Sequence, residues 1–392
     1  MDNTYDNRLS TDVITIKNDN ELQKFVNYYN KSNIFTTIKH LTIKTYNNIS
    51  TTFLQESISK LHELIKIDIW HCYDLINIVF PESINNFHDL TIFHISHIYD
   101  LTLYSLIESF GTLTALKELK LNYCSAITHL PESFGNLSAL TALYIYNCCN
   151  LTHLPESFGN LHNLTIFTII NCYLLSNLPE SVSNLRMLST LTIFNCSNIT
   201  NLPERFGNLS ALTIFNICYC SNLTHLPDSF GNLTTLTTFI INNCHGITHF
   251  PESIGHLYSL THIEIDNCKK ITYLPESFGN LRTITKLVVI NCYNLIHLPL
   301  SFGNLHSLII LHINGCNNIK NSFVPNSICF CKNLQRVLVS NINILPPSMI
   351  LLTNLNEIFV INDDTINIQN IYDIRAQWYK ILKNQNTTYV VE

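Results

Sequence analysis

Residues 140–161 read Leu140-Thr-Ala-Leu143-Tyr-Ile145-Tyr-Asn-Cys148-Cys-Asn-Leu151-Thr-His-Leu154-Pro-Glu-Ser-Phe158-Gly-Asn-Leu161. Apolar Leu143 and Ile145 alternate with Ala142, Tyr144 and Tyr146, which is the pattern of a short strand with one buried face. The first part of this unit therefore predicts a strand.

The second part of the unit predicts a turn that packs back onto the strand. Pro155 cannot continue a strand ladder but suits the first position of a short helix or turn. Glu156 then lies near the positive end of its own turn. Phe158 and Leu161 point inward, and we expect Gly159 to supply the left-handed residue that ends the turn.

This unit is repeated along the chain. Prolines recur every 24 residues at Pro131, Pro155, Pro179, Pro203, Pro227, Pro251, Pro275 and Pro299. Cysteines recur every 24 residues at Cys124, Cys148, Cys172, Cys196, Cys220, Cys244, Cys268, Cys292 and Cys316. Looser copies extend the array backward to Ile98, Cys72 and Tyr46 and forward to Ile342, giving about 14 units between residues 35 and 364. One unit cannot bury its own apolar face, whereas stacked units can.

The unit L-x-x-L-x-L-x-x-C-x-x-L-x-x-L-P-x-x-F-G-N-L resembles the leucine-rich-repeat family. Among its subtypes it is most similar to the repeats of plant disease-resistance proteins, and the Asn- and Ile-rich composition resembles leucine-rich-repeat proteins of amoebae and their giant viruses. The resemblance implies an α/β fold: a curved solenoid with a parallel sheet on its concave face and short helices or 3-10 turns on its convex side. It also implies that the concave face binds protein.

The two ends of the chain predict caps for this solenoid. Residues 1–34 contain a strand-like Val13–Ile16 and helical spacing from Asn20 to Tyr29. Residues 365–392 contain an amphipathic helical pattern from Ile368 to Lys383. Such ends cover the last apolar rung of a repeat array.

Composition narrows the classes of function and partner. Charged residues make up 13% of the 392 residues, about half of the usual ~25%, and the net charge is −6. No basic field exists to attract phosphates, so we expect no nucleic-acid partner. We also expect no signal peptide, no transmembrane segment and no membrane partner, and hence a cytoplasmic monomer.

Three periodic columns of reactive side chains invite functional interpretations. Stacked cysteines could form metal sites or disulfides. Side chains in such a column run parallel instead of converging, however, so we expect buried structural thiols and no metal. The family also places Asn or Cys at this position to satisfy backbone groups. Cys329 and Cys331 lie outside the column, and core placement is favoured for them over reactivity.

A histidine column precedes the prolines, at His129, His153, His225, His249 and His297. A pH switch or a transition-metal patch is conceivable there. Because Tyr273, Asn177 and Asn201 occupy the same position, it mainly requires a polar planar side chain. An acidic stripe follows the prolines, at Glu132, Glu156, Glu180, Glu204, Asp228, Glu252 and Glu276. We expect it to stabilise the turns, with cation binding along the convex edge as the alternative.

The solvent-facing strand positions carry many apolar and aromatic residues, which is a signature of an interaction surface. The alternative is that such residues simply suit strands. We predict partner-binding residues at Tyr144, Tyr146, Ile166, Ile170, Phe194, Tyr219, Ile240, His262, Glu264 and Asp266. Glu264 and Asp266 would bias the orientation of the partner electrostatically.

Phosphate-binding, zinc-protease and nucleophile-elbow motifs are missing from the sequence, so we predict neither catalytic residues nor a cofactor. The first hypothesis is a non-enzymatic scaffold that binds a protein partner on the concave face. The alternative is an adaptor that recruits an enzyme, such as a ubiquitin ligase, through an end cap. A recently expanded array without a defined partner is a third reading of the near-identical units over residues 131–304.

Overall fold

The computed structural model describes residues 12–18, 20–21, 24, 27, 38–44, 61–71, 84–98, 108–316, 323–362 and 365–384. The chain divides into two compact units, Met1–Cys196 and Ser197–Glu392. Most of the helix expected between residues 20 and 29 lies outside the described residues, as do Tyr46 and Cys72.

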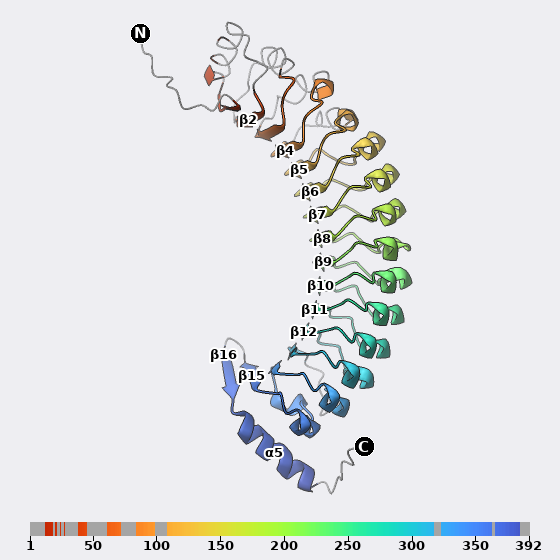
Figure 1. The fold of residues 1–392 in the computed structure, drawn as a ribbon, viewed down its shortest axis with the longest axis vertical. Helices are drawn as coiled ribbons and strands as arrows, with labels where there is room; N and C mark the ends of the chain where they lie inside the picture. Colours follow the sequence, from red (N-terminus) through yellow and green to blue (C-terminus); the bar gives the residue numbers. More distant parts are fainter. Residues whose placement is uncertain are drawn as a thin grey trace, which may run out of the picture. The chain divides into compact units, whose positions relative to one another are not determined.

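The first unit is a parallel sheet in which each strand pairs with the next strand along the chain. Its strands are β1 (Val13–Ile16), β2 (His40–Lys44), β3 (Lys66–Trp70), β4 (Ile92–Ser96), β5 (Glu118–Asn122), β6 (Ala142–Tyr146), β7 (Ile166–Ile170) and β8 (Thr190–Phe194). The 3-10 turns between them are η2 (Ile84–Asn86), η3 (Phe110–Thr112), η4 (Glu132–Asn136), η5 (Glu156–Asn160) and η6 (Glu180–Asn184). The turns lie behind the strands, on the outer side of the unit (Figure 1).

The second unit continues the same pattern and then departs from it. Its parallel strands are β9 (Ile214–Cys218), β10 (Thr238–Asn242), β11 (His262–Asp266), β12 (Lys286–Ile290), β13 (Ile310–Asn314), β14 (Arg336–Val339) and β15 (Glu357–Asn362). Its 3-10 turns are η7 (Phe206–Asn208), η8 (Asp228–Asn232), η9 (Glu252–His256), η10 (Glu276–Asn280), η11 (Leu300–Asn304), η12 (Asn326–Phe330), η13 (Ile342–Ile344) and η14 (Pro347–Leu351). Strand β16 (Thr365–Gln369) pairs antiparallel with β15, and helix α5 (Ile371–Asn384) follows. The parallel sheet expected from the sequence therefore has an antiparallel last strand.

The core of each unit is built from the inward side chains of successive repeats. Leu143 and Ile145 of β6 are fully buried, as are Phe158 of η5 and Leu161. The phenylalanines of successive turns stack, with ring centroids of Phe134 and Phe158 6.3 Å apart. Because each ring is covered by side chains of the adjacent repeats, the apolar face of one repeat is completed by its neighbours.

A threonine ladder joins the repeats where the strands begin. The Thr165 hydroxyl donates to the carbonyl of Thr141 at 2.9 Å, and the Thr141 hydroxyl donates to the carbonyl of Lys117 at 3.0 Å. Thr261 and Thr237 repeat this bond in the second unit at 3.0 Å. The ladder satisfies polar groups in pairs without using charge.

An asparagine column joins the repeats where the strands end. Asn147, Asn171 and Asn195 adopt left-handed backbone angles, with φ between 54° and 57°, which Asn tolerates better than most residues. This angle turns the backbone N–H of Asn147 toward the carbonyl of Ile170, 2.8 Å away. The side chains also bond in series: the Asn171 amide donates to Asn147 Oδ1 at 2.6 Å and the Asn195 amide to Asn171 Oδ1 at 2.8 Å.

The role predicted for Gly159 is wrong. Among the described residues, Gly315 is the one glycine with positive φ, and the other left-handed residues directly follow the strands, as Asn147, His97 and Tyr219 do. Gly159 is required for close approach instead, because a Cβ there would lie 2.5 Å from the Ser181 carbonyl oxygen of the next repeat. The glycine sets the spacing between adjacent turns.

Replacing Gly159 by Ala should lower the free energy of unfolding by about 1–3 kcal/mol, because the added methyl group separates adjacent turns. Ser183 occupies the equivalent position in η6 and already carries a Cβ. Ser183→Ala is the matched control: its buried Oγ has no hydrogen-bond partner in the described structure, so its removal should leave stability nearly unchanged. Denaturant titration of both variants tests this, and equal stabilities would contradict the close-approach argument.

Candidate functional site

The candidate site is the solvent-facing side of the strands. In each five-residue strand the second and fourth side chains are buried in the core, and the first, third and fifth lie on the other face. Parallel pairing in register aligns these outward side chains into rows that cross the strands.

In the first unit the fifth strand position forms an apolar row. Tyr146 of β6 lies opposite Ile170 of β7, which lies opposite Phe194 of β8. All three side chains are partly exposed. Ile166 begins β7 and Tyr144 is central in β6, so the structure brings together these five residues of the predicted binding set. We call them the aromatic patch: Tyr144, Tyr146, Ile166, Ile170 and Phe194.

Aromatic and charged contacts order one side of the aromatic patch. The rings of Tyr144 and Tyr146 are 6.0 Å apart, and the Lys120 ammonium lies 5.2 Å from the Tyr146 ring centroid. Burial raises the pKa of Tyr144 and of Tyr146, and the charge of Glu118 raises both further. Both hydroxyls therefore remain neutral hydrogen-bonding groups at neutral pH.

A network of partly exposed polar side chains lies on the strands before the aromatic patch, and sequence reasoning missed it. His94 Nδ1 is 2.8 Å from Asp68 Oδ1, and His94 Nε2 is 2.9 Å from Glu118 Oε1. Lys66 Nζ is 3.0 Å from Asp68 Oδ2. Both ring nitrogens of His94 thus lie within hydrogen-bonding distance of a carboxylate oxygen. The three strands β3, β4 and β5 are linked by this network.

The Asp68 carboxyl is tuned by two opposing effects. Burial raises its pKa, but the hydrogen bonds from His94 and Lys66 outweigh burial and leave the pKa below its ordinary value. Strands β3, β4 and β5 follow one another at intervals of 26 residues, whereas the regular 24-residue repeats, in which outward strand positions can be counted, begin at β5. The sequence pattern therefore did not predict this network.

In the second unit the structure places Ile240, His262, Glu264 and Asp266 on adjacent strands. Ile240 lies opposite Glu264 in the strand register. Glu264 Oε1 accepts from the Asn242 amide at 3.0 Å, and Asp266 Oδ1 accepts from the Asn291 amide at 3.1 Å. Burial raises the pKa of Asp266. His262 Nε2 is 3.9 Å from Glu264 Oε2.

Tyr219 does not lie in these rows. Strand β9 ends at Cys218, and Tyr219 occupies the left-handed corner after it, with φ of 57° and 47% of its surface exposed. It replaces the asparagine of the other repeats at the end of the strand. Tyr219 was predicted to lie on the strand face because it directly follows Cys218, the last residue of the strand.

An apolar row near the end of the second unit was also missed. Val288, His312, Leu338, Phe359 and Ile368 lie opposite one another on five successive strands. Val288 is 4% exposed and Ile368 is 74% exposed. The signal was weak because repeats after Cys316 depart from the 24-residue period.

The cysteine column is buried, as predicted. Cys124, Cys148 and Cys172 are fully buried, and Cys148 Sγ lies 3.5 Å from the Tyr146 carbonyl oxygen. Burial raises the pKa of Cys292 to about 12 and of Cys316 to about 11. Cys329 and Cys331 are buried as well. Within the described part of the chain, no three His, Cys, Asp or Glu side chains are grouped to hold a metal ion.

Four rings of the histidine column bond to the hydroxyl of the preceding residue, whereas the fifth, His297, follows an isoleucine and its Nδ1 lies 3.1 Å from the Leu298 carbonyl oxygen. His153 Nδ1 lies 2.9 Å from Thr152 Oγ1, and that hydroxyl already donates to the Thr128 carbonyl, so the ring donates to it. The same contact recurs at His129, His225 and His249. Asn201 accepts from the Thr200 hydroxyl at 2.8 Å. The prediction of a polar planar side chain at this position is confirmed.

The acidic stripe stabilises turns, but in the next repeat. Glu132 Oε2 accepts from the Ser157 backbone N–H at 3.0 Å, and Glu276 accepts from the N–H groups of Leu300 and Ser301 at 3.0 and 2.9 Å. Burial acts to raise the pKa of Glu276, but these N–H groups outweigh it and lower the pKa. The stripe therefore links repeats, where the sequence predicted that each carboxylate would serve its own turn.

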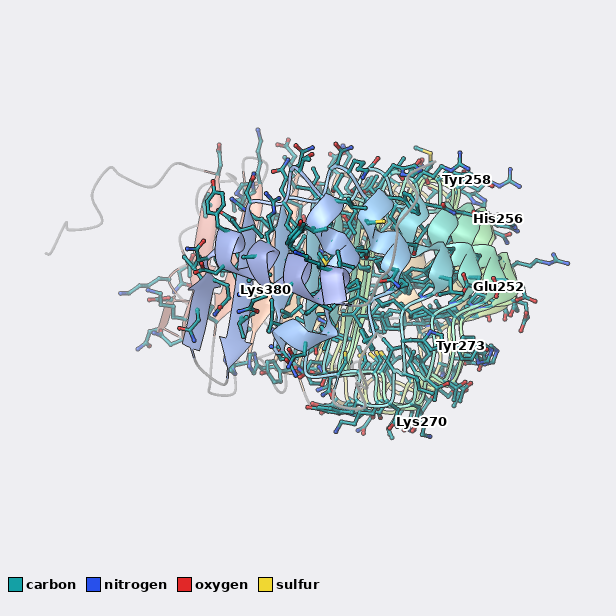
Figure 2. The ribbon with its side chains drawn as sticks, turned by 90° about the horizontal axis from the view of Figure 1, so that it is seen from below. Glu252, His256, Tyr258, Lys270, Tyr273 and Lys380 are labelled. Atoms are coloured by element: carbon teal, nitrogen blue, oxygen red, sulfur yellow. The ribbon has the colours of Figure 1, made fainter. Side chains whose placement is uncertain are left out.

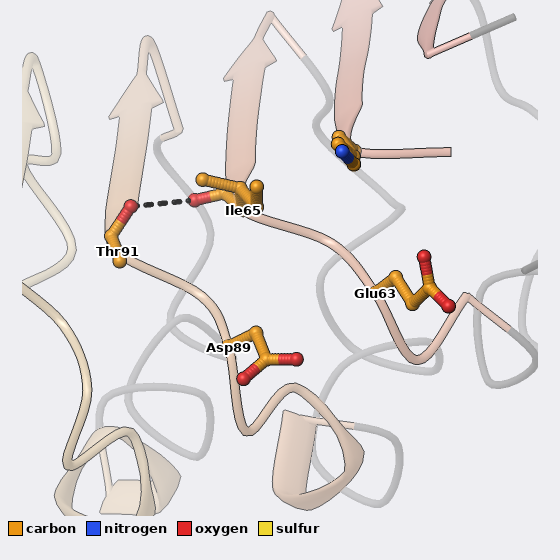
Figure 3. A pocket seen from close by; sticks show the side chains of 5 residues that line it. Glu63, Ile65, Asp89 and Thr91 are labelled. Atoms are coloured by element: carbon orange, nitrogen blue, oxygen red, sulfur yellow. Dashed lines mark hydrogen bonds between the residues drawn. The ribbon is translucent and has the colours of Figure 1, made fainter. Parts of the chain in front are cut away.

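A shallow depression lies where strands β2, β3 and β4 begin, lined by Lys39, Glu63, Ile65, Asp89 and Thr91 (Figure 3). Its one drawn hydrogen bond, from the Thr91 hydroxyl to the Ile65 carbonyl at 3.2 Å, belongs to the threonine ladder. The depression therefore lies along the edge of the repeats that the threonine ladder forms.

None of the described helices is long and apolar enough to cross a membrane.

Comparison with known families identifies the repeats. Residues 73–219 match the family model described as a leucine-rich repeat region. Residues 203–335 match the model of Zer-1-like leucine-rich repeats. A search of curated protein sequences gives no significant match.

Solved structures of the same fold are numerous. A leucine-rich-repeat protein of Leptospira interrogans is 20% identical, with a TM-score of 0.60 over 89% of this chain and 83% of its own. The leucine-rich repeat domain of the type III effector XopL is 25% identical, with a TM-score of 0.52 over 60% of this chain and 80% of its own. Toll of Drosophila, solved in complex with Spatzle, is 16% identical, with a TM-score of 0.55 over 86% of this chain and 48% of its own. The fold is a leucine-rich-repeat solenoid.

Asp68→Asn should lower the free energy of unfolding by about 1–3 kcal/mol at neutral pH, because it weakens charged hydrogen bonds to His94 and Lys66. The folded-state pKa of Asp68 is depressed, so its stabilisation is present above the unfolded-state pKa of about 3.9 and is lost as pH falls through the folded-state pKa. Denaturant titrations at pH 7 and at pH 3 should therefore show a difference from wild type that shrinks in acid. Asp89→Asn, which removes an exposed carboxylate, is the control. A difference that persists unchanged in acid would refute the assignment.

The buried thiols should resist alkylation in the native protein. Burial and a raised pKa both suppress the reactive thiolate of Cys268 and Cys292, whereas Cys149 and Cys218 are partly exposed. Iodoacetamide labelling with peptide mass spectrometry should modify Cys149 before the column cysteines. Rapid native labelling of Cys172 or Cys244 would show that the column is open to solvent.

Proposed function

The chain is a leucine-rich-repeat protein, and we propose that it is a non-enzymatic scaffold that binds a protein partner on its strand face. The aromatic patch carries this proposal. Tyr146, Ile170 and Phe194 are aligned on three adjacent strands and remain partly exposed after the repeats have packed. A contiguous apolar surface of this kind gains free energy when a partner covers it.

The aromatic patch has the chemistry of a binding anchor. Tyr and Phe are large and lose little conformational freedom on binding, and Tyr offers a hydroxyl at its tip. Tyr144 and Tyr146 keep neutral hydroxyls, so a partner can bury their rings without burying charge. The partner that fits is an apolar protein segment with hydrogen-bonding groups at its rim.

The second unit offers a different kind of contact. Glu264 and Asp266 lie on the strand face, each already bonded to an asparagine amide. A basic group on the partner would meet two carboxylates whose positions are fixed, which favours one orientation of binding. Ile240 and His262 lie beside them.

Residues 1–34 and 365–392 serve as caps in this proposal. Ile374 and Trp378 of α5 are buried, and Arg375 Nη2 donates to the carbonyls of Leu352 and Leu355 at 2.7 and 3.2 Å. The helix thus covers polar and apolar groups of the last repeat.

We place the protein in the cytoplasm. The L-P-x-x-F-G-N-L turn supports the plant disease-resistance subtype, and the composition supports a relation to the leucine-rich-repeat proteins of amoebae and giant viruses.

An adaptor that recruits an enzyme through its end cap is the second candidate. Tyr372 and Tyr379 of α5 are 77% and 62% exposed, so the outer face of this cap carries aromatic rings that the solenoid does not use. Removing them with Tyr372→Ala and Tyr379→Ala should not affect binding by the aromatic patch.

The triple variant Tyr144→Ala/Tyr146→Ala/Phe194→Ala should lower affinity for the strand-face partner by about a hundredfold or more, since it removes three anchors. Affinity capture with quantitative mass spectrometry would compare it with wild type. The matched control is Tyr258→Ala/Tyr273→Ala/Tyr293→Ala, which removes three exposed rings away from the strand face. Tyr258 and Tyr273 project from opposite edges of the repeats (Figure 2). If the strand-face triple variant retains every partner, the proposed surface is wrong.

A further inference from the structure

The last strand of the second unit ends the sheet with an unused edge. Strand β16 reverses direction after β15 and pairs with it from Ile358↔Gln369 to Asn362↔Thr365. In the strand order β16 is terminal, and within the described residues it pairs with β15 alone. Helix α5 continues from the end of β16 (Figure 1). One row of backbone N–H and C=O groups on β16 is therefore open to another strand.

Strand β16 itself lacks the charged residues and prolines that commonly prevent strand pairing at an edge. Residues 365–369 read Thr-Ile-Asn-Ile-Gln, without charge or proline. Proteins commonly protect such edges with lysine, proline, a bulge or a covering segment. Here the side chain of Ile368 is instead 74% exposed on the strand face. The edge can therefore form backbone hydrogen bonds and apolar contacts with another strand.

In place of the monomer expected from the sequence, we propose that β16 pairs with β16 of a second copy of this chain, forming a two-fold symmetric dimer with a continuous sheet. Two identical strands related by a two-fold axis perpendicular to the sheet run antiparallel, so each supplies the donors and acceptors that the other needs. The absence of charge on residues 365–369 means that no like charges oppose each other across the axis.

The side chains on the strand face support the same occupant. Leu338, Phe359 and Ile368 form the end of an apolar row, and its last member is the most exposed. In the dimer, the corresponding row of the second copy extends this row, with its residues in the reverse order. The exposed Ile368 is then covered from the side where this chain offers no neighbour, which supplies apolar burial in addition to backbone hydrogen bonds. Tyr372, in the first turn of α5 directly after β16, is 77% exposed.

Sedimentation velocity of the full chain over a wide range of concentration tests this proposal. Wild type should form a dimer and nothing larger. Ile368→Lys should raise the dimer dissociation constant at least about tenfold, because it removes apolar contact and places two like charges near the axis. Ile296→Lys is the matched control, an isoleucine 58% exposed elsewhere in the same unit, and it should dimerise as wild type does. Circular dichroism of both variants checks that the fold is retained.

Three results would overturn the proposal. The first is a wild-type monomer at every concentration. The second is a dimer that Ile368→Lys leaves intact, which would place the interface elsewhere. The third is open-ended assembly, which would indicate that β16 pairs with the β1 edge of another copy in a head-to-tail contact. Binding by the aromatic patch is measured separately and does not depend on the outcome.

Discussion

The structure depends on hydrogen bonds that pass from each repeat to the next at the two ends of every strand. At the end of β6, Asn147 turns into the left-handed region so that its N–H reaches the Ile170 carbonyl of the following strand. At the start of β7, the Thr165 hydroxyl and backbone N–H both reach the Thr141 carbonyl. Because every one of these partners belongs to another repeat, a single repeat leaves its polar groups unsatisfied and its apolar face open. Stability is therefore a property of neighbours.

These polar ladders explain the unusual composition. Backbone groups along the repeat edges are satisfied by Thr, Asn and Ser, and the carboxylates that do occur, such as Glu132, accept from the next turn. Many of these polar groups bond to a neutral partner in the adjacent repeat, in keeping with a charged content of only 13%. Polar groups of the edges and turns bond to neighbouring repeats. On the strand face, apolar side chains such as Ile170 are aligned on adjacent strands and remain partly exposed, and this is why the binding proposal rests there.

Sequence periodicity was sufficient to predict what one repeat does within itself. The strand at Ala142–Tyr146, the turn after Pro155 and the burial of Cys148 all follow from the pattern of residues in a single unit. The incorrect predictions concern the contacts between adjacent repeats. Gly159 was assigned a backbone angle when its role is to let Ser181 approach, and Glu156 was assigned to its own turn when its carboxylate accepts from the Ser181 N–H. A one-dimensional pattern contains no spacing between stacked turns, so these contacts could not be read from it.

The same reasoning explains why the candidate site was only partly predictable. The five members of the aromatic patch lie in regular units, where strand positions can be counted from the cysteine, and they fall on one face as counting requires. His94 and Ile368 lie where the repeat length changes, and there the register depends on how the backbone accommodates the irregular segment. At β16 the irregularity reverses the strand, so the sheet ends in a short antiparallel strand that carries the exposed Ile368. Two copies of an edge strand related by a two-fold axis run antiparallel to each other, so the proposed closed pair depends on the uncharged sequence and exposed side chain of β16 and not on its direction within the sheet. The segment that follows the last repeat thus determines which assembly can form at this edge, without any change to the repeats that precede it.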